Sequence, residues 1–313
     1  MKLNSNRKFI LIYTRVIFNY FFIYNKMTTV KSIKSLNANN KISPNQLAFF
    51  IICLGIFIVS SILALISSMK DGKPTCEKYV LNSYLYLSVS ISLLICLILL
   101  FNMMFPNYVF RVFGLFIFII LALLSFVFIY LINTISPLDV IKKRLVWMLF
   151  IINYALLLLP IIQVGFMFNQ HTLLMSTLLL VIGIVALITF ISYLNPNFII
   201  KNSAGWTPYV ITGLLILILS YIIPLILCRF FISCNLDFMN SYFYYLAIFG
   251  VILFTFIIIY RTKIIVENAQ KCKSPQDADY IKESSGLLIS MINLFLDILR
   301  LRRRRNKSFI LRR

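Results

Sequence analysis

Three polar side chains lie inside an apolar segment near the end of the chain. Ser290, Asn293 and Asp297 fall within residues 285–299, which a run of arginines follows. Their i, i+3, i+7 spacing places them on one stripe of a helix. Ionisable groups inside a membrane are costly and mark ion paths, proton relays or buried partners. The stripe is therefore expected to face protein, water or the interface and not lipid. The apolar side chains expected to pack between neighbouring helices are Leu288, Met291, Phe295 and Ile298.

A basic residue stands where the preceding span is expected to end. The apolar span 241–260 stops at Arg261, and a polar loop is expected over 261–284. That loop is long enough to fold back, so Arg261 is one expected partner of the Asp297 carboxylate. The more ordinary interpretation pairs Asp297 with Arg300 at i+3, near the membrane surface.

The composition indicates a membrane protein. The chain has 313 residues, of which 61% are hydrophobic and 12% are charged, about half the charge of a soluble domain. Several apolar runs reach the ~20 residues that cross a bilayer as a helix. Runs such as LLILIL do not alternate as the strands of a membrane barrel do. We therefore predict an all-α, polytopic helical membrane protein. The net charge of +21 lies in loops and tails, which indicates membrane topology and not nucleic-acid binding.

The chain divides into a basic N-terminal tail over 1–45 and a membrane domain over 46–313. The tail holds a weak apolar segment at 9–24, and Met27 is an alternative start. About seven spans and a short closing segment are expected, followed by a basic tail over 300–313. The expected spans are 47–69, 80–104, 108–132, 145–168, 172–194, 208–231 and 241–260, and the closing segment is 285–299.

Prolines, amides and glycines occur inside these spans. Neighbouring helices are expected to absorb the kinks at Pro160 and Pro224. Asn153 and Gln163 either line a polar path or, as the simpler interpretation, form hydrogen bonds between helices. Close helix packing is expected at Gly183, Gly213 and Gly250.

The closing segment decides the predicted topology. Its fifteen residues would make a helix ~22 Å long, short of the ~30 Å hydrocarbon core. If the segment is re-entrant, the C-terminal tail lies on the same side of the membrane as loop 261–284. That side then holds twenty of the basic residues outside the N-terminal tail, and the opposite side holds two. If it crosses, they divide twelve to ten. The positive-inside rule then favours a re-entrant segment with both regions in the cytosol. The basic N-terminus fits this arrangement only if 9–24 also crosses.

The cysteines and the single histidine indicate no metal site. Cys53 and Cys96 lie inside spans as small apolar packers. Cys228 and Cys234 form a local disulfide or, more simply, remain two free thiols. No C-x-x-C pair exists and His171 is the only histidine, which argues against zinc. The sequence shows no nucleophile–base pair and no phosphate loop, so neither an enzyme nor a cofactor is expected.

Four pieces of the chain carry a resemblance to a known family. The two most specific are 245–270, ending in YRTKIIVENAQ, and 277–300, DADYIKESSGLLISMINLFLDILR. The others are 176–190 and the loop through Phe198, Ile199 and Gly205, and the turn Phe105-Pro106-Asn107 agrees. In order, spacing and loop length the chain resembles the Bax inhibitor family, the transmembrane Bax inhibitor motif proteins. The chain has one more strong span than the family, which we assign to 47–69.

The resemblance implies a six- or seven-span intracellular membrane protein that dampens programmed cell death and lowers stored calcium. It also implies a pH-sensitive calcium leak that depends on two aspartates. Here those two positions hold Arg261 and Ser290, with Thr262 retained and Lys263 in place of a glutamine. Two carboxylates share a proton and titrate near neutrality, whereas an arginine stays charged and repels calcium. The chain is therefore expected to be Bax-inhibitor-like without the regulated leak. The supporting positions are Thr262, Lys263, Asn293 and Asp297.

The expected partners are the lipid bilayer and, from the resemblance, apoptosis regulators or calcium-handling membrane proteins, but no nucleic acid. The expected location is the endoplasmic reticulum or Golgi of a eukaryotic (host) cell. The arginines of the tail are expected to face anionic lipid, at about 1 kcal/mol per charge, with a nuclear signal as the alternative. They are Arg302, Arg303, Arg304 and Arg305. The alternative functions are an unrelated multi-span transporter or channel for small solutes, and a non-transporting membrane adaptor.

Overall fold

The structure, a computed structural model, describes residues 44–104, 115–167, 171–194, 203–230 and 236–310. These residues form eight helices and one two-stranded hairpin. Seven of the helices are long and apolar enough to cross a membrane, and α8 contains a shorter apolar run over Gly205–Tyr221. The chain is therefore an all-α polytopic membrane protein, as the sequence predicts.

Some predictions concern residues that the structure does not describe. The weak apolar segment 9–24, the turn Phe105-Pro106-Asn107 and Cys234 lie outside the described ranges. The side chains of His171 and Cys228 are also outside the description, although their backbones belong to helices. The predictions made for these residues stay predictions.

The helices divide into two compact units. The first unit comprises the described part of Met1–Phe168 together with Lys271–Ser285, and the second comprises Asn169–Gln270 with Gly286–Arg313. The last helix, α10 (Tyr280–Ile310), begins in the first unit and continues in the second.

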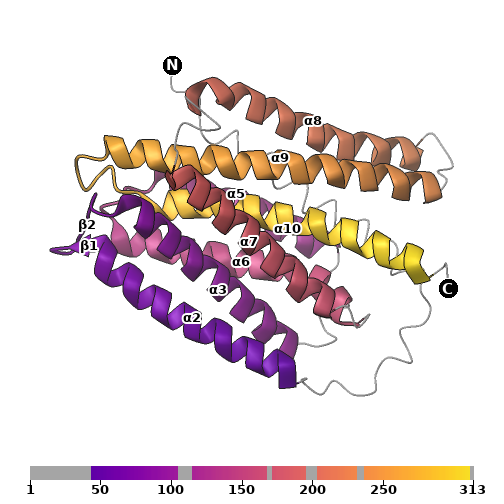
Figure 1. The fold of residues 1–313 in the computed structure, drawn as a ribbon, viewed down its shortest axis with the longest axis horizontal. Helices are drawn as coiled ribbons and strands as arrows, with labels where there is room; N and C mark the ends of the chain where they lie inside the picture. The colour runs from indigo at the N-terminus through magenta and orange to yellow at the C-terminus, as the bar shows by residue number, and fades with distance from the viewer. Residues whose placement is uncertain (1–43, 105–114, 168–170, 195–202, 231–235, 311–313) are drawn as a thin grey trace. The chain divides into compact units, whose positions relative to one another are not determined.

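In the first unit, α2 and α3 form a helical pair with a short hairpin between them (Figure 1). The elements are α2 (Pro44–Ser68), β1 (Met69–Lys70), β2 (Lys73–Pro74), α3 (Tyr79–Met104), α5 (Leu115–Thr134) and α6 (Val140–Met167). Helix α6 packs against both α3 and α5. In the hairpin, Asp71 and Gly72 adopt positive φ angles of 53° and 74°, so a glycine suits the second position. The chain reverses there within two residues.

The second unit contains α7 (His171–Leu194), α8 (Ser203–Phe230), α9 (Leu236–Lys271) and the greater part of α10. Helices α8 and α9 lie side by side (Figure 1). Both Pro160 in α6 and Pro224 in α8 are inside helices, as the sequence predicts.

The ends of α9 and α10 differ from the predicted boundaries. Helix α9 continues ten residues past Arg261 to Lys271, so the predicted loop 261–284 shrinks to residues 272–279. Helix α10 has 31 residues and is not a short segment. The prediction was wrong because hydropathy marks the membrane boundary and not the helix end. Arginine, lysine and glutamate are good helix formers, so the helix continues where the apolar run stops.

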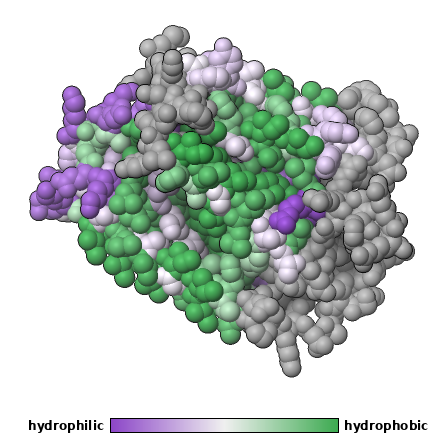
Figure 2. Space-filling view, in the orientation of Figure 1, coloured by the Kyte–Doolittle hydropathy of each residue, from purple (hydrophilic) through white to green (hydrophobic). Residues whose placement is uncertain are grey.

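The surface is strongly apolar, as a lipid environment requires. Hydrophobic side chains cover most of the described surface in the face shown by Figure 2. Helix α2 contributes many of them: only 17% of its most apolar window is buried. Hydroxyls inside the helices donate back to their own helix, as Ser90 Oγ does to the carbonyl of Tyr86 at 2.8 Å. Such bonds satisfy polar groups where no water is available.

Gly213 allows α8 and α9 to approach closely. A Cβ at this position would lie 2.8 Å from Cδ1 of Leu253, which itself is buried. We therefore expect Gly213→Leu to lower the free energy of unfolding by about 1–3 kcal/mol, the usual cost of overpacking. Gly183→Leu is the matched control, because a Cβ there would meet nothing within 4 Å. Close packing was predicted at Gly183 as well, and that prediction was wrong. Equal losses of thermal stability in detergent for both variants would contradict this account of the α8–α9 contact.

Candidate functional site

The polar stripe of α10 is buried. Every residue from Glu283 to Leu299 is buried in the structure. Ser290, Asn293 and Asp297 are 0%, 1% and 0% exposed. The apolar residues predicted to pack beside them, namely Leu288, Met291, Phe295 and Ile298, are buried too. The prediction that this segment avoids lipid is confirmed.

Two residues of the stripe bond to their own helix. Ser290 Oγ donates to the Gly286 carbonyl at 3.1 Å, and Asn293 Nδ2 donates to the Ile289 carbonyl at 2.9 Å. The buried Oδ1 of Asn293 accepts no hydrogen bond within the described part of the chain. These backbone bonds lower the cost of burying the two side chains.

The guanidinium of Arg261 lies against the backbone of α10 at Gly286. A Cβ added to Gly286 would be 3.1 Å from Nη1 and 3.2 Å from Cζ of Arg261. The absence of a side chain at Gly286 is what admits the planar group. Gly286 is one helical turn before Ser290 and its carbonyl accepts the Ser290 hydroxyl. Arg261 and Ser290, the two positions where the resemblance implies aspartates, therefore both lie beside Gly286.

Arg261 does not neutralise Asp297 in the predicted way. Eleven residues separate Gly286 from Asp297 on α10, which at 1.5 Å per residue is about 16 Å. A guanidinium held at Gly286 cannot also reach that carboxylate. Asp297 is also not exposed, contrary to the simpler interpretation, because its side chain is fully buried, and its pairing with Arg300 stays a prediction.

The two supporting positions that follow Arg261 lie on α9. Thr262 and Lys263 are 2% and 8% exposed, so the helix that extends past Arg261 carries them into the interior. The sequence expected them at the start of a loop. Their burial follows from the same extension of α9.

The basic end of α10 packs on aromatic and hydroxyl groups of the second unit. Arg300 donates to the Tyr221 hydroxyl, and its Cζ lies 5.2 Å from the centre of that ring and 6.0 Å from that of Phe243. Such contacts with ring faces stabilise a cation in a poorly hydrated place. Arg302 donates to Thr177 Oγ1 at 3.2 Å. Contact of Arg302 to Arg305 with lipid stays a prediction, and the side chains of Arg304 and Arg305 are not described.

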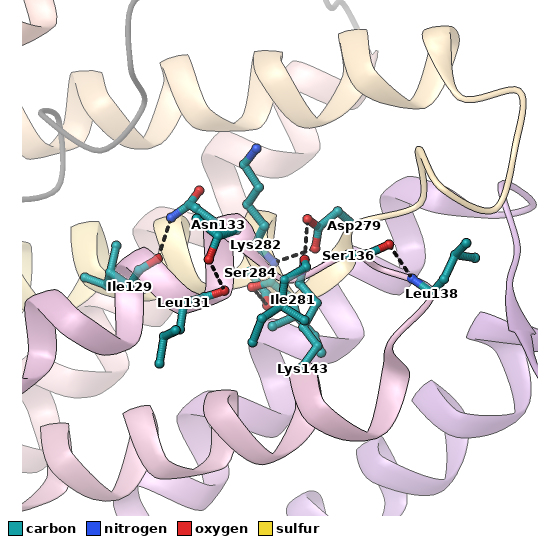
Figure 3. Close-up of polar contacts among 12 residues, drawn as sticks. Ile129, Leu131, Asn133, Ser136, Leu138, Lys143, Asp279, Ile281, Lys282 and Ser284 are labelled. Atoms are coloured by element: carbon teal, nitrogen blue, oxygen red, sulfur yellow. Dashed lines mark hydrogen bonds and ion pairs between the residues drawn. The ribbon is translucent and has the colours of Figure 1, made fainter.

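The first unit contains a buried ion pair that the sequence did not predict. Lys143 Nζ lies 2.7 Å from Oδ2 of Asp279, and the two side chains are 2% and 18% exposed. The same ammonium donates to the Ile135 carbonyl at 2.8 Å. Figure 3 shows the lysine of α6 reaching the aspartate at the start of α10. Charge-assisted bonds of this kind are about twice as strong as neutral ones.

Asp279 also caps α10. Its second oxygen, Oδ1, accepts a bond from the Lys282 backbone amide at 3.2 Å, and its carbonyl accepts from Glu283 N at 3.3 Å. Aspartate is a preferred N-cap because its oxygen satisfies an otherwise unpaired amide. One carboxylate therefore starts α10 and ties it to α6. In the sequence, the available signal for this helix cap was an aspartate directly before a long apolar helix.

An aromatic cluster lies at the same end of the first unit. Tyr280 stacks on Tyr86 with centroids 5.9 Å apart and meets Tyr79 at 5.3 Å. Arg144 Nη2 donates to the Tyr86 hydroxyl at 2.8 Å, and Trp147 packs edge-on against the same ring. The cluster holds the first turn of α10 next to α3 and α6.

The amide of Asn153 joins two helices. Its Nδ2 donates to the Leu121 carbonyl at 3.0 Å and to Ser125 Oγ, both on α5. The interpretation of Asn153 as a bond between helices is confirmed. Nothing in these contacts indicates a path for ions.

The described residues contain no group of three or more His, Cys, Asp or Glu side chains that could hold a metal ion. The geometry defines a multi-span helical membrane protein whose closing helix is buried from Glu283 to Leu299 and carries the polar stripe there. A family model described as inhibitor of apoptosis-promoting Bax1 matches residues 76–307, about three quarters of the chain. The chain belongs to the Bax inhibitor family. No curated protein and no solved structure matches it.

The family match begins after α2. Helix α2 ends at Ser68, and the matched region starts at Cys76. Of the seven remaining described helices, six lie wholly within the match, and α10 extends three residues beyond it. This agrees with the prediction that the first strong span is the additional one.

Proposed function

We propose that this protein modulates cell death, calcium homeostasis or both in an intracellular membrane, and that it does so without the pH-regulated calcium leak of its family. It acts as a membrane protein and not as an enzyme. Its location is the endoplasmic reticulum or Golgi, and its partners are apoptosis regulators or calcium-handling membrane proteins. Membership of the Bax inhibitor family over residues 76–307 supports the first half of the proposal.

The position of Arg261 supports the proposed absence of the pH-regulated calcium leak. In the family, as the resemblance implies, two aspartates form the pH-sensitive centre. Here a permanently charged guanidinium lies against Gly286, one turn from Ser290, which carries no ionisable group. A divalent cation at this place would meet a fixed positive charge in a medium of low dielectric, where repulsion is strong. Proton binding cannot remove that charge, so a change of pH does not lift this repulsion.

Expression in cells that lack their own family members tests the cellular role. We expect the protein to lower the calcium released from the endoplasmic reticulum, to raise survival after an apoptotic stimulus, or both. A chain with Glu77→Gln is the matched control, since it alters only an exposed ion pair with Lys70, and it should behave as the wild type. If neither released calcium nor survival changes at equal expression, the proposed role is wrong.

A further inference from the structure

A disulfide joins two polar connections of the first unit. Cys76, just before α3, is bonded to Cys272, just after α9, and the two are 196 residues apart in sequence with Cα atoms 5.7 Å apart. The remaining described cysteines, Cys53 and Cys96, are free and buried within helices. The bond therefore ties the β1–β2 hairpin to the 272–279 connection, outside the spans.

Both connections hold their cysteines in place by local hydrogen bonds. Thr75 N donates to the Ser68 carbonyl at 3.1 Å and closes the hairpin beside Cys76. The Asp277 carboxylate accepts from Ser274 Oγ at 2.9 Å and from the amides of Lys273 and Ser274 at 3.2 and 3.0 Å. Those bonds, the Ser274 hydroxyl first, hold the pKa of Asp277 below its usual value. The two sulfurs thus meet in ordered, water-exposed turns.

The length of α10 changes the membrane topology expected from the sequence. A re-entrant segment was favoured because residues 285–299 were too short to cross. The helix instead offers an apolar span of 24 residues, Tyr280–Arg303, and ~20 are enough. If α2, α3 and α5 to α10 each cross once, the hairpin and the 272–279 connection share one side. The chain ahead of α2 and the tail after α10 then share the other side.

The basic residues agree with that arrangement. With α10 crossing, the side of the two tails holds eighteen of the thirty Lys and Arg residues, and the hairpin side holds twelve. The positive-inside rule then places the tails in the cytosol. The basic N-terminus, which fitted the re-entrant topology only with an extra crossing, fits here directly.

We propose that the β1–β2 hairpin and the 272–279 connection lie on the non-cytosolic side of the membrane, where the Cys76–Cys272 disulfide forms and fixes the start of α10. Disulfides persist in the lumen or outside the cell and are rare in the cytosol. In the bond-forming step the two thiols give up two protons and two electrons. A disulfide of that compartment, small-molecule or enzyme-borne, accepts them and becomes two thiols.

The bond acts on α10 through the connection that follows it. Seven residues after Cys272 comes Asp279, which caps α10 and pairs with Lys143. Closing a long loop restricts the unfolded chain, so reduction of the purified protein is expected to lower its Tm. The same reduction should leave the Tm of a Cys76→Ser variant unchanged.

Glycosylation mapping tests the orientation. A spacer with an Asn-X-Thr acceptor is placed between Gly72 and Lys73 in one chain and after Arg313 in another, and both are expressed in cells. We expect a glycan on the hairpin acceptor and none on the tail acceptor. A glycan on the tail acceptor without one on the hairpin would overturn the proposal.

The bond itself is tested in membranes whose thiols are alkylated before lysis. Mass spectrometry of the digest is expected to find the peptide of Cys76 linked to that of Cys272. Cys76→Ser and Cys272→Ser should each abolish the linked peptide, and Cys53→Ser, which removes a buried free thiol, should leave it intact. Recovery of both peptides in alkylated, unlinked form from the wild type would overturn the proposal even if the hairpin carries a glycan.

Discussion

Asp279→Asn is expected to lower the free energy of unfolding by about 3–5 kcal/mol, the cost of leaving one partner of a buried ion pair alone. The ammonium of Lys143, with 2% of its side chain exposed, would lose its carboxylate and keep only the Ile135 carbonyl. Asparagine is as good an N-cap as aspartate, so the variant removes the charge while the start of α10 stays capped. Thermal or denaturant unfolding in detergent measures the loss.

Two further variants separate the ion pair from general damage. Lys143→Met with Asp279→Asn removes both charges, and its loss should be smaller than that of Asp279→Asn alone. Glu77→Gln breaks the pair with Lys70, which has a similar length of 3.2 Å but side chains 67% and 69% exposed. An exposed pair contributes less than about 1 kcal/mol. Equal losses from Asp279→Asn and Glu77→Gln would contradict the importance of burial.

Arg261→Asp together with Ser290→Asp is expected to create a calcium leak that responds to pH. The double variant removes the guanidinium from Gly286 and puts a carboxylate at each of the two positions. At an effective dielectric of ~20, two like unit charges ~4 Å apart repel each other by about 4 kcal/mol. The double variant removes a repulsion of this kind between Arg261 and a calcium ion. We therefore expect at least about a tenfold rise in calcium flux through liposomes. The flux should change with pH, because paired carboxylates titrate near neutrality.

The two single variants are the controls for the expected gain in calcium flux. Ser290→Asp alone keeps Arg261, whose guanidinium would neutralise the new carboxylate one turn from Gly286, so no leak is expected. Arg261→Asp alone supplies a single carboxylate and no coupled pair, so its flux should be smaller than that of the double variant. A leak from Ser290→Asp as large as that of the double variant would show that Arg261 does not block the site.

The sequence predicted the membrane class and most spans, because a run of ~20 apolar residues leaves a helix as the main solution in lipid. The burial of Ser290, Asn293 and Asp297 was predictable for the same reason. The ends of α9 and α10 could not be predicted from hydropathy. The apolar runs stop near Arg261 and Arg302, but arginine is a good helix former, so each helix continues past its arginine. The predicted pairing of Arg261 with Asp297 was wrong for a geometric reason. Gly286 has no side chain, so the guanidinium lies against it, far from Asp297.

The two long-range links of the first unit were missed. Lys143 with Asp279 and Cys76 with Cys272 are separated by 136 and 196 residues. Neither pair has a local spacing that a sequence pattern could reveal. Lys143 was counted as a loop charge, although it occupies the first turn of α6 and is buried. Only the packing of the helices brings such residues together.

Calcium flux through the wild-type protein in dye-loaded liposomes tests the central claim most directly. Flux is measured across the neutral pH range, with empty liposomes and a family member that has both aspartates as references. This account predicts a wild-type flux equal to that of empty liposomes at every pH, because Arg261 keeps its charge throughout. A wild-type flux that approaches the reference member and changes severalfold with pH would contradict it.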